Sequence, residues 1–471
     1  MKNIRKMLFA VFAAVFVGGC CRPAFCFSEK NYSRRAFPEE FNIVDFGAVG
    51  DGRTKNTAAI QRAIDACAVR GGKVIVPPGV FMTGTIYLKS NVEFHISKGA
   101  TLLGSPDLKD YNEPDAYPQN FFAKSEGWSP KHLILALEVE NVALTGTGII
   151  DGNARAFFDN TPRGYGEIGW RNGICNAKDF ENCGRPGQEI VFVECKNIKV
   201  KDLQLKDMTC WSCFFHGCDN VQISGLRIET DIRYANTDGI DIDSCRNVTV
   251  SDCIIRTGDD AIAIRCSVMK LKNKNRMCEN ITVNNCVFHV SASGMRISVG
   301  GGTIRNVVVS NVVIEHAGRG INVSNSYGSR AKGVHISDVS FNNIIIRNTP
   351  SPILISSGTA NSTAYLKNIS FNNVNIASNG QIMIAGLGGR RMSNISFSNL
   401  YFKCLENVFE VKKNGVDLGS AVFKIQSADN VFFNNVVVAD NKIPLLATHD
   451  TTNVCGEIKS FREKDDPGLR K

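Results

Sequence analysis

Short alternations of apolar and polar residues recur along most of the chain. The repeated unit is Asn-(Val/Ile)-x-(Val/Ile/Phe), followed a few residues later by a second short alternation. Its clearest copies begin at Asn197, Asn220, Asn247, Asn280, Asn306, Asn368, Asn394 and Asn430. Strands this short cannot bury a face alone, so successive units must stack to enclose a core. The pattern predicts an all-β chain folded as a right-handed parallel β-helix. We expect the asparagine of each coil to bond that of the next, and the long gap between Asn306 and Asn368 to hold two coils.

Three segments depart from this pattern. Residues 56–70 carry apolar residues at helical spacing, at Ile60, Ala63, Ile64, Cys67 and Ala68. We expect a short helix there that caps the N-terminal end of the stack, with Asn56 as N-cap and Gly71-Gly72 at its end. Residues 105–135 and 153–185 are predicted to be loops over one face. The remainder is predicted as one β-helix domain over 38–450, with a loose tail over 451–471.

The first residues are typical of an export signal. Lys2, Arg5 and Lys6 precede an apolar stretch that runs from Met7 to Val17. Val17-Gly18-Gly19-Cys20 is similar to a bacterial lipobox. We therefore expect residues 1–19 to be a lipoprotein-type signal peptide and Cys20 to be the lipid-anchored first residue. The protein would be exported, either periplasmic or anchored at the outer membrane; ordinary cleavage near Cys26 is the alternative.

Charge narrows the class of partner. The formal net charge of +9 falls to +6 without residues 1–19, which hold three basic residues and no acidic ones. A basic exported protein suits an acidic polysaccharide. No block of Lys and Arg interleaved with aromatic residues is present, so nucleic acid is not the expected partner. We expect a monomer.

The chain has 17 cysteines, and several occupy a repeated position. Cys195, Cys218, Cys245 and Cys278 each begin a Cys-x-Asn-(Val/Ile) unit, which either stacked buried thiols or disulfides would explain. Cys175 with Cys183 is the best candidate disulfide. Cys210-Trp211-Ser212-Cys213 has redox-motif spacing without the sequence context, so we interpret it as structural. No His/Cys set has zinc-site spacing, and we expect no metal and no cofactor.

Two acidic clusters, Asn236-Thr237-Asp238 and Asp259-Asp260, are about one solenoid turn apart. Aligning their coils on inward aliphatic pairs predicts three outward columns: Asp238, Asp260, Ser293 and Arg319; then Asp241, Ala263, Arg296 and Asn322; then Asp243, Arg265, Ser298 and Ser324. Side chains in such a column are about 4.8 Å apart. Single clusters of this kind often cap turns. Several carboxylates in one groove repel each other, a cost that folding alone does not explain, so we interpret them as acid–base groups.

These motifs resemble glycoside hydrolase family 28, the polygalacturonase family. The resemblance begins at Phe46-Gly47-Ala48-Val49-Gly50-Asp51-Gly52 and continues through Gly148-Ile149-Ile150-Asp151-Gly152 and Arg185-Pro186. Its most specific parts are Asn236-Thr237-Asp238-Gly239-Ile240-Asp241 and Gly258-Asp259-Asp260-Ala261-Ile262-Ala263-Ile264.

The resemblance implies inverting hydrolysis of a pectic polysaccharide or oligosaccharide that contains galacturonic acid. Asp259 would be the general acid, its pKa raised by its acidic neighbours, and Asp238 and Asp260 would activate water. An inverting pair is expected to be about 6.5–9.5 Å apart, which leaves room for that water.

Two family motifs are altered. The family's Gly-His-Gly falls on Ala292-Ser293-Gly294, and its Arg-Ile-Lys falls on Gly320-Ile321-Asn322. His289 is the nearest other histidine, and the sequence leaves open whether its side chain reaches the site. The predicted substrate-binding residues are Asn236, Asp241, Arg265, Arg296, Ser293 and Arg319; the three arginines either replace the lost charge or are solvated surface residues. These changes favour a branched, decorated or terminal galacturonic acid linkage.

Aromatic residues of the two loops either wall the groove or pack on the solenoid, namely Trp128, Phe157, Phe158, Tyr165 and Trp170. Trp211 is expected to pack in the wall. Two other functions remain open. One is a pectate-lyase-like β-elimination, with calcium held by Asp238, Asp241, Asp243 and Asp260. The other is a carbohydrate-binding β-helix without catalysis.

Overall fold

A computed structural model describes residues 39–113, 116–120, 129–158, 184–326, 333–358, 363–386, 390–405 and 419–462. These residues belong to one compact unit that begins at Pro38. The predicted signal peptide, Cys20, and the Cys175–Cys183 pair lie outside the described residues.

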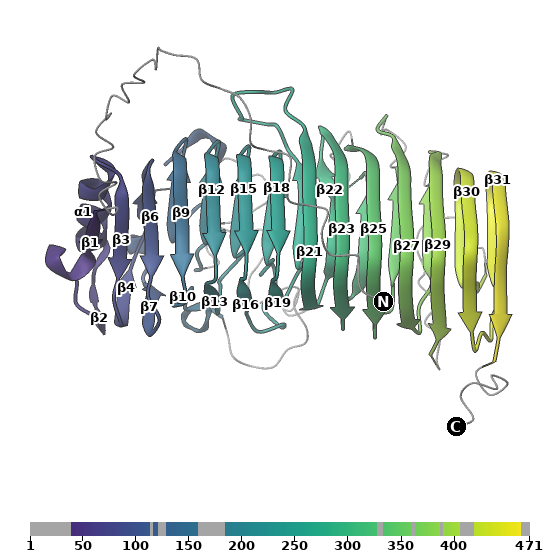
Figure 1. The fold of residues 1–471 in the computed structure, drawn as a ribbon, viewed down its shortest axis with the longest axis horizontal. Coiled ribbons are helices and arrows are strands. Elements are labelled where there is room, and N and C mark those ends of the chain that lie inside the picture. The colour runs from purple at the N-terminus through teal and green to yellow at the C-terminus, as the bar shows by residue number, and fades with distance from the viewer. Residues whose placement is uncertain are drawn as a thin grey trace, which may run out of the picture. The chain divides into compact units, whose positions relative to one another are not determined.

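The described strands pair in parallel, each with the strand of the next coil, and the coils follow one another along the long axis from α1 to β31 (Figure 1). The predicted parallel β-helix is confirmed. Three columns of paired strands, called here the first, second and third ladders, form its walls.

Strands of the first ladder are β1 (Glu40–Asn42), β3 (Gly72–Val76), β6 (Val92–Ile96), β9 (Glu140–Gly146), β12 (Lys196–Lys201), β15 (Asp219–Ser224) and β18 (Arg246–Ser251). Strands of the second ladder are β2 (Asp51–Lys55), β4 (Gly79–Thr83), β7 (Ala100–Gly104), β10 (Ile149–Asp151), β13 (Gln204–Lys206), β16 (Arg227–Glu229) and β19 (Ile254–Thr257).

From β21 onward the first two ladders share long strands that bend between them. These are β21 (Cys278–Val290), β23 (Thr303–Glu315), β25 (His335–Arg347), β27 (Leu366–Ser378), β29 (Met392–Cys404), β30 (Phe423–Ala439) and β31 (Leu446–Phe461).

The third ladder continues into β30 and β31. Its own strands are β5 (Ile86–Leu88), β8 (Ile134–Leu137), β11 (Ile190–Val193), β14 (Cys213–His216), β17 (Ile240–Asp243), β20 (Ile262–Cys266), β22 (Ser293–Gly300), β24 (Arg319–Ser324), β26 (Ile353–Ser357) and β28 (Ile382–Gly386).

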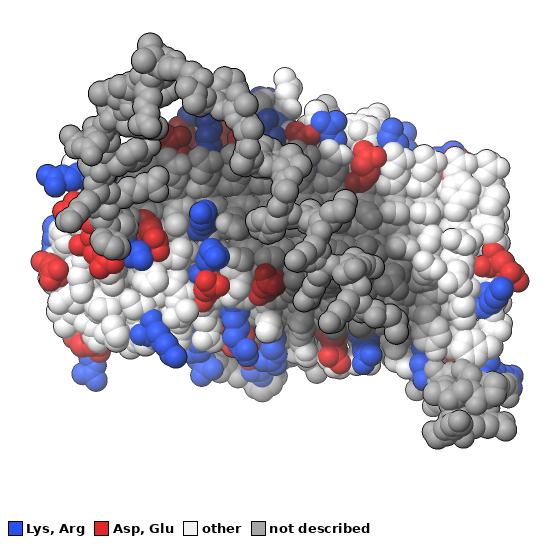
Figure 2. Space-filling model, in the orientation of Figure 1, with Lys and Arg blue, Asp and Glu red and all other residues white. Residues whose placement is uncertain are grey.

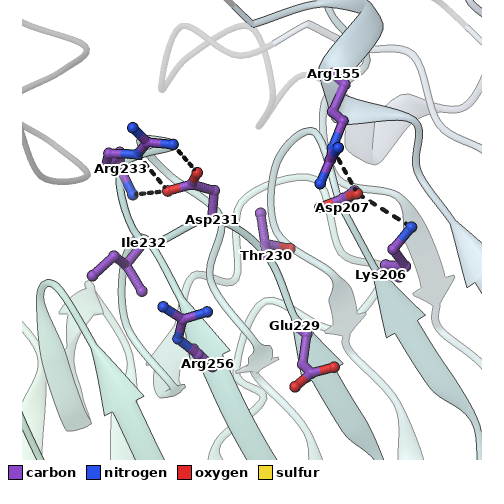
Figure 3. A pocket seen from close by; sticks show the side chains of 9 residues that line it. All are labelled: Arg155, Lys206, Asp207, Glu229, Thr230, Asp231, Ile232, Arg233 and Arg256. Carbon is purple, nitrogen blue, oxygen red and sulfur yellow. Dashed lines mark hydrogen bonds and ion pairs between the residues drawn. The ribbon is translucent and has the colours of Figure 1, made fainter. Parts of the chain in front are cut away.

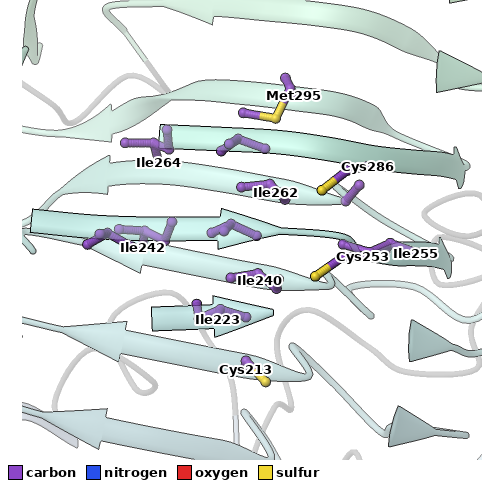
Figure 4. Packing of buried hydrophobic residues seen from close by; sticks show 14 of the residues in the cluster. Cys213, Ile223, Ile240, Ile242, Cys253, Ile255, Ile262, Ile264, Cys286 and Met295 are labelled. Carbon is purple, nitrogen blue, oxygen red and sulfur yellow. The ribbon is translucent and has the colours of Figure 1, made fainter. Parts of the chain in front are cut away.

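The core is a stack of inward aliphatic and thiol side chains (Figure 4). Ile240 pairs with Ile262, and Ile262 pairs with Met295, so like residues lie above one another in consecutive coils. The four Cys-x-Asn thiols are buried and unbridged, at Cys195, Cys218, Cys245 and Cys278. This confirms stacked thiols rather than disulfides. Cys210 and Cys213 are also buried free thiols, as a structural role requires.

An asparagine ladder marks the bend at which the first ladder begins in each coil. Asn247 donates from Nδ2 to Asn220 Oδ1 at 3.1 Å, and Asn280 donates to Asn247 at 3.0 Å. These residues have φ near +56° to +60°, the left-handed conformation that asparagine tolerates better than most residues. In the long gap Asp338 takes the same place and accepts from Asn368 Nδ2 at 2.8 Å. The expected ladder and the extra coil are confirmed.

The two ends of the stack differ from the prediction in the N-cap of the helix and in the C-terminal tail. Helix α1 (Thr57–Ala68) buries Ile60, Ala63, Ile64 and Cys67, as expected. Asn56 precedes it but does not cap it, because its side chain instead bonds both backbone groups of Val49. The predicted loose tail is wrong for residues 451–461, which belong to β31 and pair with β30. The hydrogen-bonding edge of the previous coil is available there, so the polar segment adds a further rung.

The predicted loop 105–135 includes the start of β8 at Ile134, and the other described parts of the two loops hold short 3-10 turns. These are η2 (Leu108–Asp110), η3 (Pro118–Asn120) and η4 (Ala154–Ala156); a fourth, η1 (Ile43–Phe46), precedes β2. Trp128, Tyr165 and Trp170 lie outside the described residues. Among the described residues, no helix has both the length and the apolar character that a membrane span requires.

Candidate active site

The two acidic clusters lie at the same edge of the third ladder. Asp238 lies shortly before β17 (Ile240–Asp243), and Asp259 with Asp260 shortly before β20 (Ile262–Cys266). The backbone N–H of Gly239 donates to the Asp260 carbonyl at 2.9 Å, which continues the β17–β20 register and sets Asp238 beside Asp260. Ser293 pairs with Arg319 one step further along. The first predicted column is therefore confirmed.

The three aspartates converge closely. Asp238, Asp259 and Asp260 are each at most 4% exposed, and one oxygen from each lies within 4.8 Å of the other two. This is shorter than the separation of about 6.5–9.5 Å that we expected for an inverting pair. The rung spacing of the ladder sets the closer distance, since Asp238 and Asp260 occupy neighbouring rungs.

The side-chain hydroxyl of Thr237 links the two acid-bearing loops. Thr237 Oγ1 donates to the Tyr234 carbonyl at 2.8 Å and accepts from the Gly258 N–H at 2.9 Å. Gly258 has no room for a side chain, because a Cβ there would collide with the Tyr234 carbonyl oxygen. The glycine before Asp259 therefore allows the close approach of the two loops.

Both oxygens of Asp260 accept hydrogen bonds. Its Oδ1 accepts from the backbone N–H of Ser293 at 2.8 Å, and its Oδ2 accepts from Arg296 Nη1 at 2.8 Å. The side chain of Arg296 is 16% exposed. Arg296 is thus no solvated surface arginine: it forms a charge-assisted contact that fixes the orientation of Asp260.

The other two carboxylates differ in their surroundings. Asn236 donates from Nδ2 to Asp259 Oδ2 at 3.2 Å. The Oδ1 of Asp238 is buried and accepts no hydrogen bond from a described residue. Burial, followed by the negative charges of Asp259, Asp241 and Asp260, raises the pKa of Asp238 well above its usual value. The raised pKa that we expected for Asp259 stays a prediction.

Arg265 belongs to a buried ionic network with Asp241 and Asp243. Its side chain is 5% exposed, with Nη1 3.8 Å from Asp241 Oδ1 and Nε 3.7 Å from Asp243 Oδ2. Its guanidinium also lies 4.4 Å from the centre of the Trp211 ring. The surface alternative is wrong for Arg265, and Trp211 packs in the wall as expected. Asp241 has no exposed surface, so it is placed to support the site from within.

Two predicted columns have different outcomes. The second is confirmed, since Asp241 pairs with Ala263, Ala263 with Arg296, and Arg296 with Asn322. The third holds for Asp243 and Arg265, but an extra residue in β22 shifts the register after Ile264. His289 belongs to β21, where it pairs with Arg256 of β19 in the second ladder. It therefore does not stand in for the missing histidine of the third ladder.

The comparisons with known proteins agree with this geometry. The family model for glycosyl hydrolases family 28 matches residues 72–418. The chain belongs to this family. Both aspartate motifs lie inside the matched region.

Individual family 28 relatives are distant. An exo-poly-alpha-D-galacturonosidase of Dickeya chrysanthemi is 28% identical over 346 residues, which cover 67% of this chain and 55% of that enzyme. An exopolygalacturonase of Arabidopsis thaliana is 26% identical, over 65% of this chain and 72% of that protein. The structure of a Yersinia enterocolitica family 28 exopolygalacturonase shares the fold, with a TM-score of 0.66 at 20% identity over 91% of this chain and 79% of that one.

The sequence reasoning did not single out two buried groups of this family 28 site. Arg185 donates from Nη1 to the carbonyls of Thr209 and Ala235, at 2.7 and 3.0 Å. Burial lowers its pKa, while the charges of its neighbours, Asp259 among them, oppose that effect. Glu189 has no exposed surface and accepts from the Thr209 backbone N–H at 3.2 Å. The Arg185-Pro186 motif was a signal for the first, but nothing in the local pattern marked the second.

Of the loop aromatics, Phe158 packs on the solenoid rather than projecting from it. Phe158 stacks on Tyr234 with ring centres 4.1 Å apart, and the Arg185 guanidinium lies 4.9 Å above the Phe158 ring. Phe158 therefore braces the segment that leads to Asp238. Arg319, half-buried at the start of β24, forms no ion pair with a described residue, which leaves its charge available to the groove.

Proposed function

We propose that this chain hydrolyses a galacturonic acid linkage in a pectic polysaccharide or oligosaccharide by acid–base catalysis. The observation that carries the proposal is the convergence of three buried carboxylates from consecutive coils. Such a cluster is costly for folding and suits proton transfer at a glycosidic bond. Membership of family 28 and the relatives' names support the substrate class.

The roles follow from the contacts of each carboxylate. Asp260, held by Arg296 and the Ser293 N–H, is suited to orient and activate water. Repulsion within the cluster favours one shared proton, and burial raises the pKa of Asp238. We assign Asp259 as the group that protonates the leaving oxygen, and Asp238 as its partner in holding the proton and the water.

We further propose that hydrolysis inverts the anomeric centre. Both Asp260 oxygens are already engaged, which fits a carboxylate that orients water better than one that forms a covalent bond to sugar. The test is proton NMR of the anomeric signals during the first turnovers of an oligogalacturonide. A product that retains the configuration of the substrate would replace this proposal with a double-displacement mechanism.

Substrate contact is assigned to the polar groups on the rim of the acid cluster. Ser293 and Arg319 lie on the column of Asp238 and Asp260, and Arg296 lies on the next one. Asn236 donates to Asp259. The two arginines provide positive charge for a galacturonate carboxylate. Arg265 and Asp241 are buried, and we assign them a supporting role rather than a contact with the substrate. The decisive experiment is incubation with a panel of pectic oligosaccharides, neutral and acidic, with products identified by mass. If no acidic oligosaccharide were cleaved, the proposed function would be wrong.

A β-eliminating enzyme is the second candidate, because three aspartate oxygens lie close enough together to hold a cation. Calcium takes 6–8 oxygen ligands. Arg296 already engages Asp260 Oδ2, and Asp241 and Asp243 are engaged by Arg265, so they do not complete the expected cradle. Elimination predicts a product that absorbs in the ultraviolet and activity that a chelator abolishes. Hydrolysis predicts neither.

We also propose export through residues 1–19, with Cys20 as a lipid-anchored first residue of a monomer. The support is the basic, apolar and lipobox order of these residues. Expression in a bacterium that processes lipoproteins, with mass analysis of the mature N-terminus, tests it. Cleavage near Cys26 without lipid would contradict the anchor.

A further inference from the structure

A second charged cavity lies on the second ladder, on a different wall from the aspartate cluster. Its volume is about 500 Å³, within the range of about 300–1,000 Å³ typical of small-ligand sites. Lys206, Glu229 and Arg256 form its floor at the ends of β13, β16 and β19, with Arg155 and Arg233 at its sides (Figure 3).

The cavity and the aspartate cluster share one connecting segment. Residues 230–233 form a wall of the cavity, and the same segment continues through Tyr234 to Asn236 and Asp238. Tyr234 closes a turn by donating its N–H to the Asp231 carbonyl at 2.9 Å, and Thr237 donates back to the Tyr234 carbonyl. A ligand in this cavity would therefore lie around the corner from the catalytic groove, outside it.

Most lining charges already have partners. Arg233 Nε donates to Asp231 Oδ1 at 2.8 Å, and Arg155 Nε lies 3.3 Å from Asp207 Oδ2. Glu229 pairs with Arg227, whose Nη2 lies 2.6 Å away outside the lining. Arg256 is the lining cation that forms no hydrogen bond or ion pair with a described residue, and it is exposed. It is available to bind an anion.

The mixture of charges points to a particular ligand. Three acidic residues among four basic ones would repel a polyanion such as nucleic acid. A sugar acid has one carboxylate for an arginine and several hydroxyls that donate to carboxylates. On the face in Figure 2 the acidic and basic side chains of the described residues are likewise interspersed.

We propose that this cavity is an accessory binding site for a uronate residue, in which Arg256 pairs with the sugar carboxylate and Asp207 and Glu229 accept from its hydroxyls. The proposal rests on the proposed function for its choice of galacturonate. The site would hold a second chain or a branch of the acidic substrate beside the groove and thereby raise its local concentration.

Isothermal titration with digalacturonate tests the site, in the Asp259→Asn protein so that no turnover occurs. Arg256→Ala should remove one binding event or weaken it by about tenfold or more, as expected for the loss of a charge-assisted contact. Arg347→Ala is the matched control: this exposed arginine lies on the same ladder at the end of β25 and does not line the cavity. It should leave the isotherm unchanged. Neutral digalactose should show no Arg256-dependent binding.

An isotherm that Arg256→Ala leaves unchanged would overturn the site, as would equal Arg256-dependent binding of digalactose. The wild-type hydrolysis assay separates this from the proposed function. Arg256-dependent binding without cleavage of any pectic oligosaccharide would uphold the site and refute the hydrolase. Cleavage without an Arg256 effect would do the reverse.

Discussion

Arg296 and Asp260 form an ion pair across neighbouring coils, with Nη1 2.8 Å from Oδ2. The family's histidine is replaced by Ser293, whose backbone N–H holds the other oxygen. The two donors fix the orientation of the carboxylate. The positive charge beside Asp260 therefore comes from Arg296, which lies on the column next to that of Ser293.

Arg296→Ala should lower kcat by about 100-fold, since a small misplacement of a reacting group costs that much. Arg296→Lys should restore part of the activity, because it keeps the charge but loses the planar fork. Steady-state kinetics on the cleaved oligosaccharide would measure both. Arg305→Ala, which breaks a wall ion pair with Glu279 at 2.7 Å, is the control and should leave kcat unchanged. Wild-type kcat in Arg296→Ala would show that the ion pair is only structural.

Asp259→Asn and Asp238→Asn should separate the acid from its partner. A general acid is needed most when the leaving oxygen is a poor leaving group. On the natural linkage both variants should be almost inactive. On an aryl galacturonide with an acidic phenol, Asp259→Asn should recover activity by at least about 100-fold relative to the natural linkage. Recovery in Asp238→Asn instead would exchange the two roles.

Gly258→Ala should damage the site without removing any functional group. The added methyl group meets the Tyr234 carbonyl, so the loop that carries Asp259 and Asp260 has to shift. We expect kcat to fall by about 100-fold. Gly301→Ala is the control, because nothing lies within 4 Å of a Cβ there. Circular dichroism would show that both variants keep the β-helix, and equal activity in the two would refute the packing argument.

Glu189 predicts a pH dependence of stability. Burial is the main cause that raises its pKa from 4.5 to about 7. The folded state therefore binds the proton more tightly than the unfolded state, so this stabilisation is full below pH 4.5 and is lost as the pH rises through about 7. The loss is on the order of 3 kcal/mol in the free energy of unfolding.

Glu189→Gln should flatten this dependence and make the protein more stable than wild type above pH 7, as judged by urea unfolding at several pH values. The exposed Glu140→Gln serves as the control and should follow the wild-type curve. A wild-type curve that is flat from pH 5 to pH 8 would contradict the assignment of the raised pKa to Glu189.

Much of the site could be predicted from the register between consecutive coils. The aliphatic pairs of consecutive coils gave the alignment, and with it the neighbourhoods of Asp238 with Asp260 and of Ala263 with Arg296. Register could not reveal burial. Arg265 was expected at the groove or the surface, yet it is buried in an ionic network with Asp241 and Asp243. The extra residue in β22 and the pairing of β31 were also not predicted from the sequence. Both depend on contacts between coils rather than on local periodicity.

The amino-acid sequence by itself determined the parallel β-helix, the asparagine ladder and the columns on which the acidic residues lie. These depend on a repeat that returns like residues to like positions, and a repeat can be read along one dimension. Only the tertiary structure decided which carboxylate is desolvated, which arginine is held at Asp260, and where a second charged cavity opens. Desolvation and pairing depend on all the atoms around a group, and those atoms come from coils and loops that are distant in the chain.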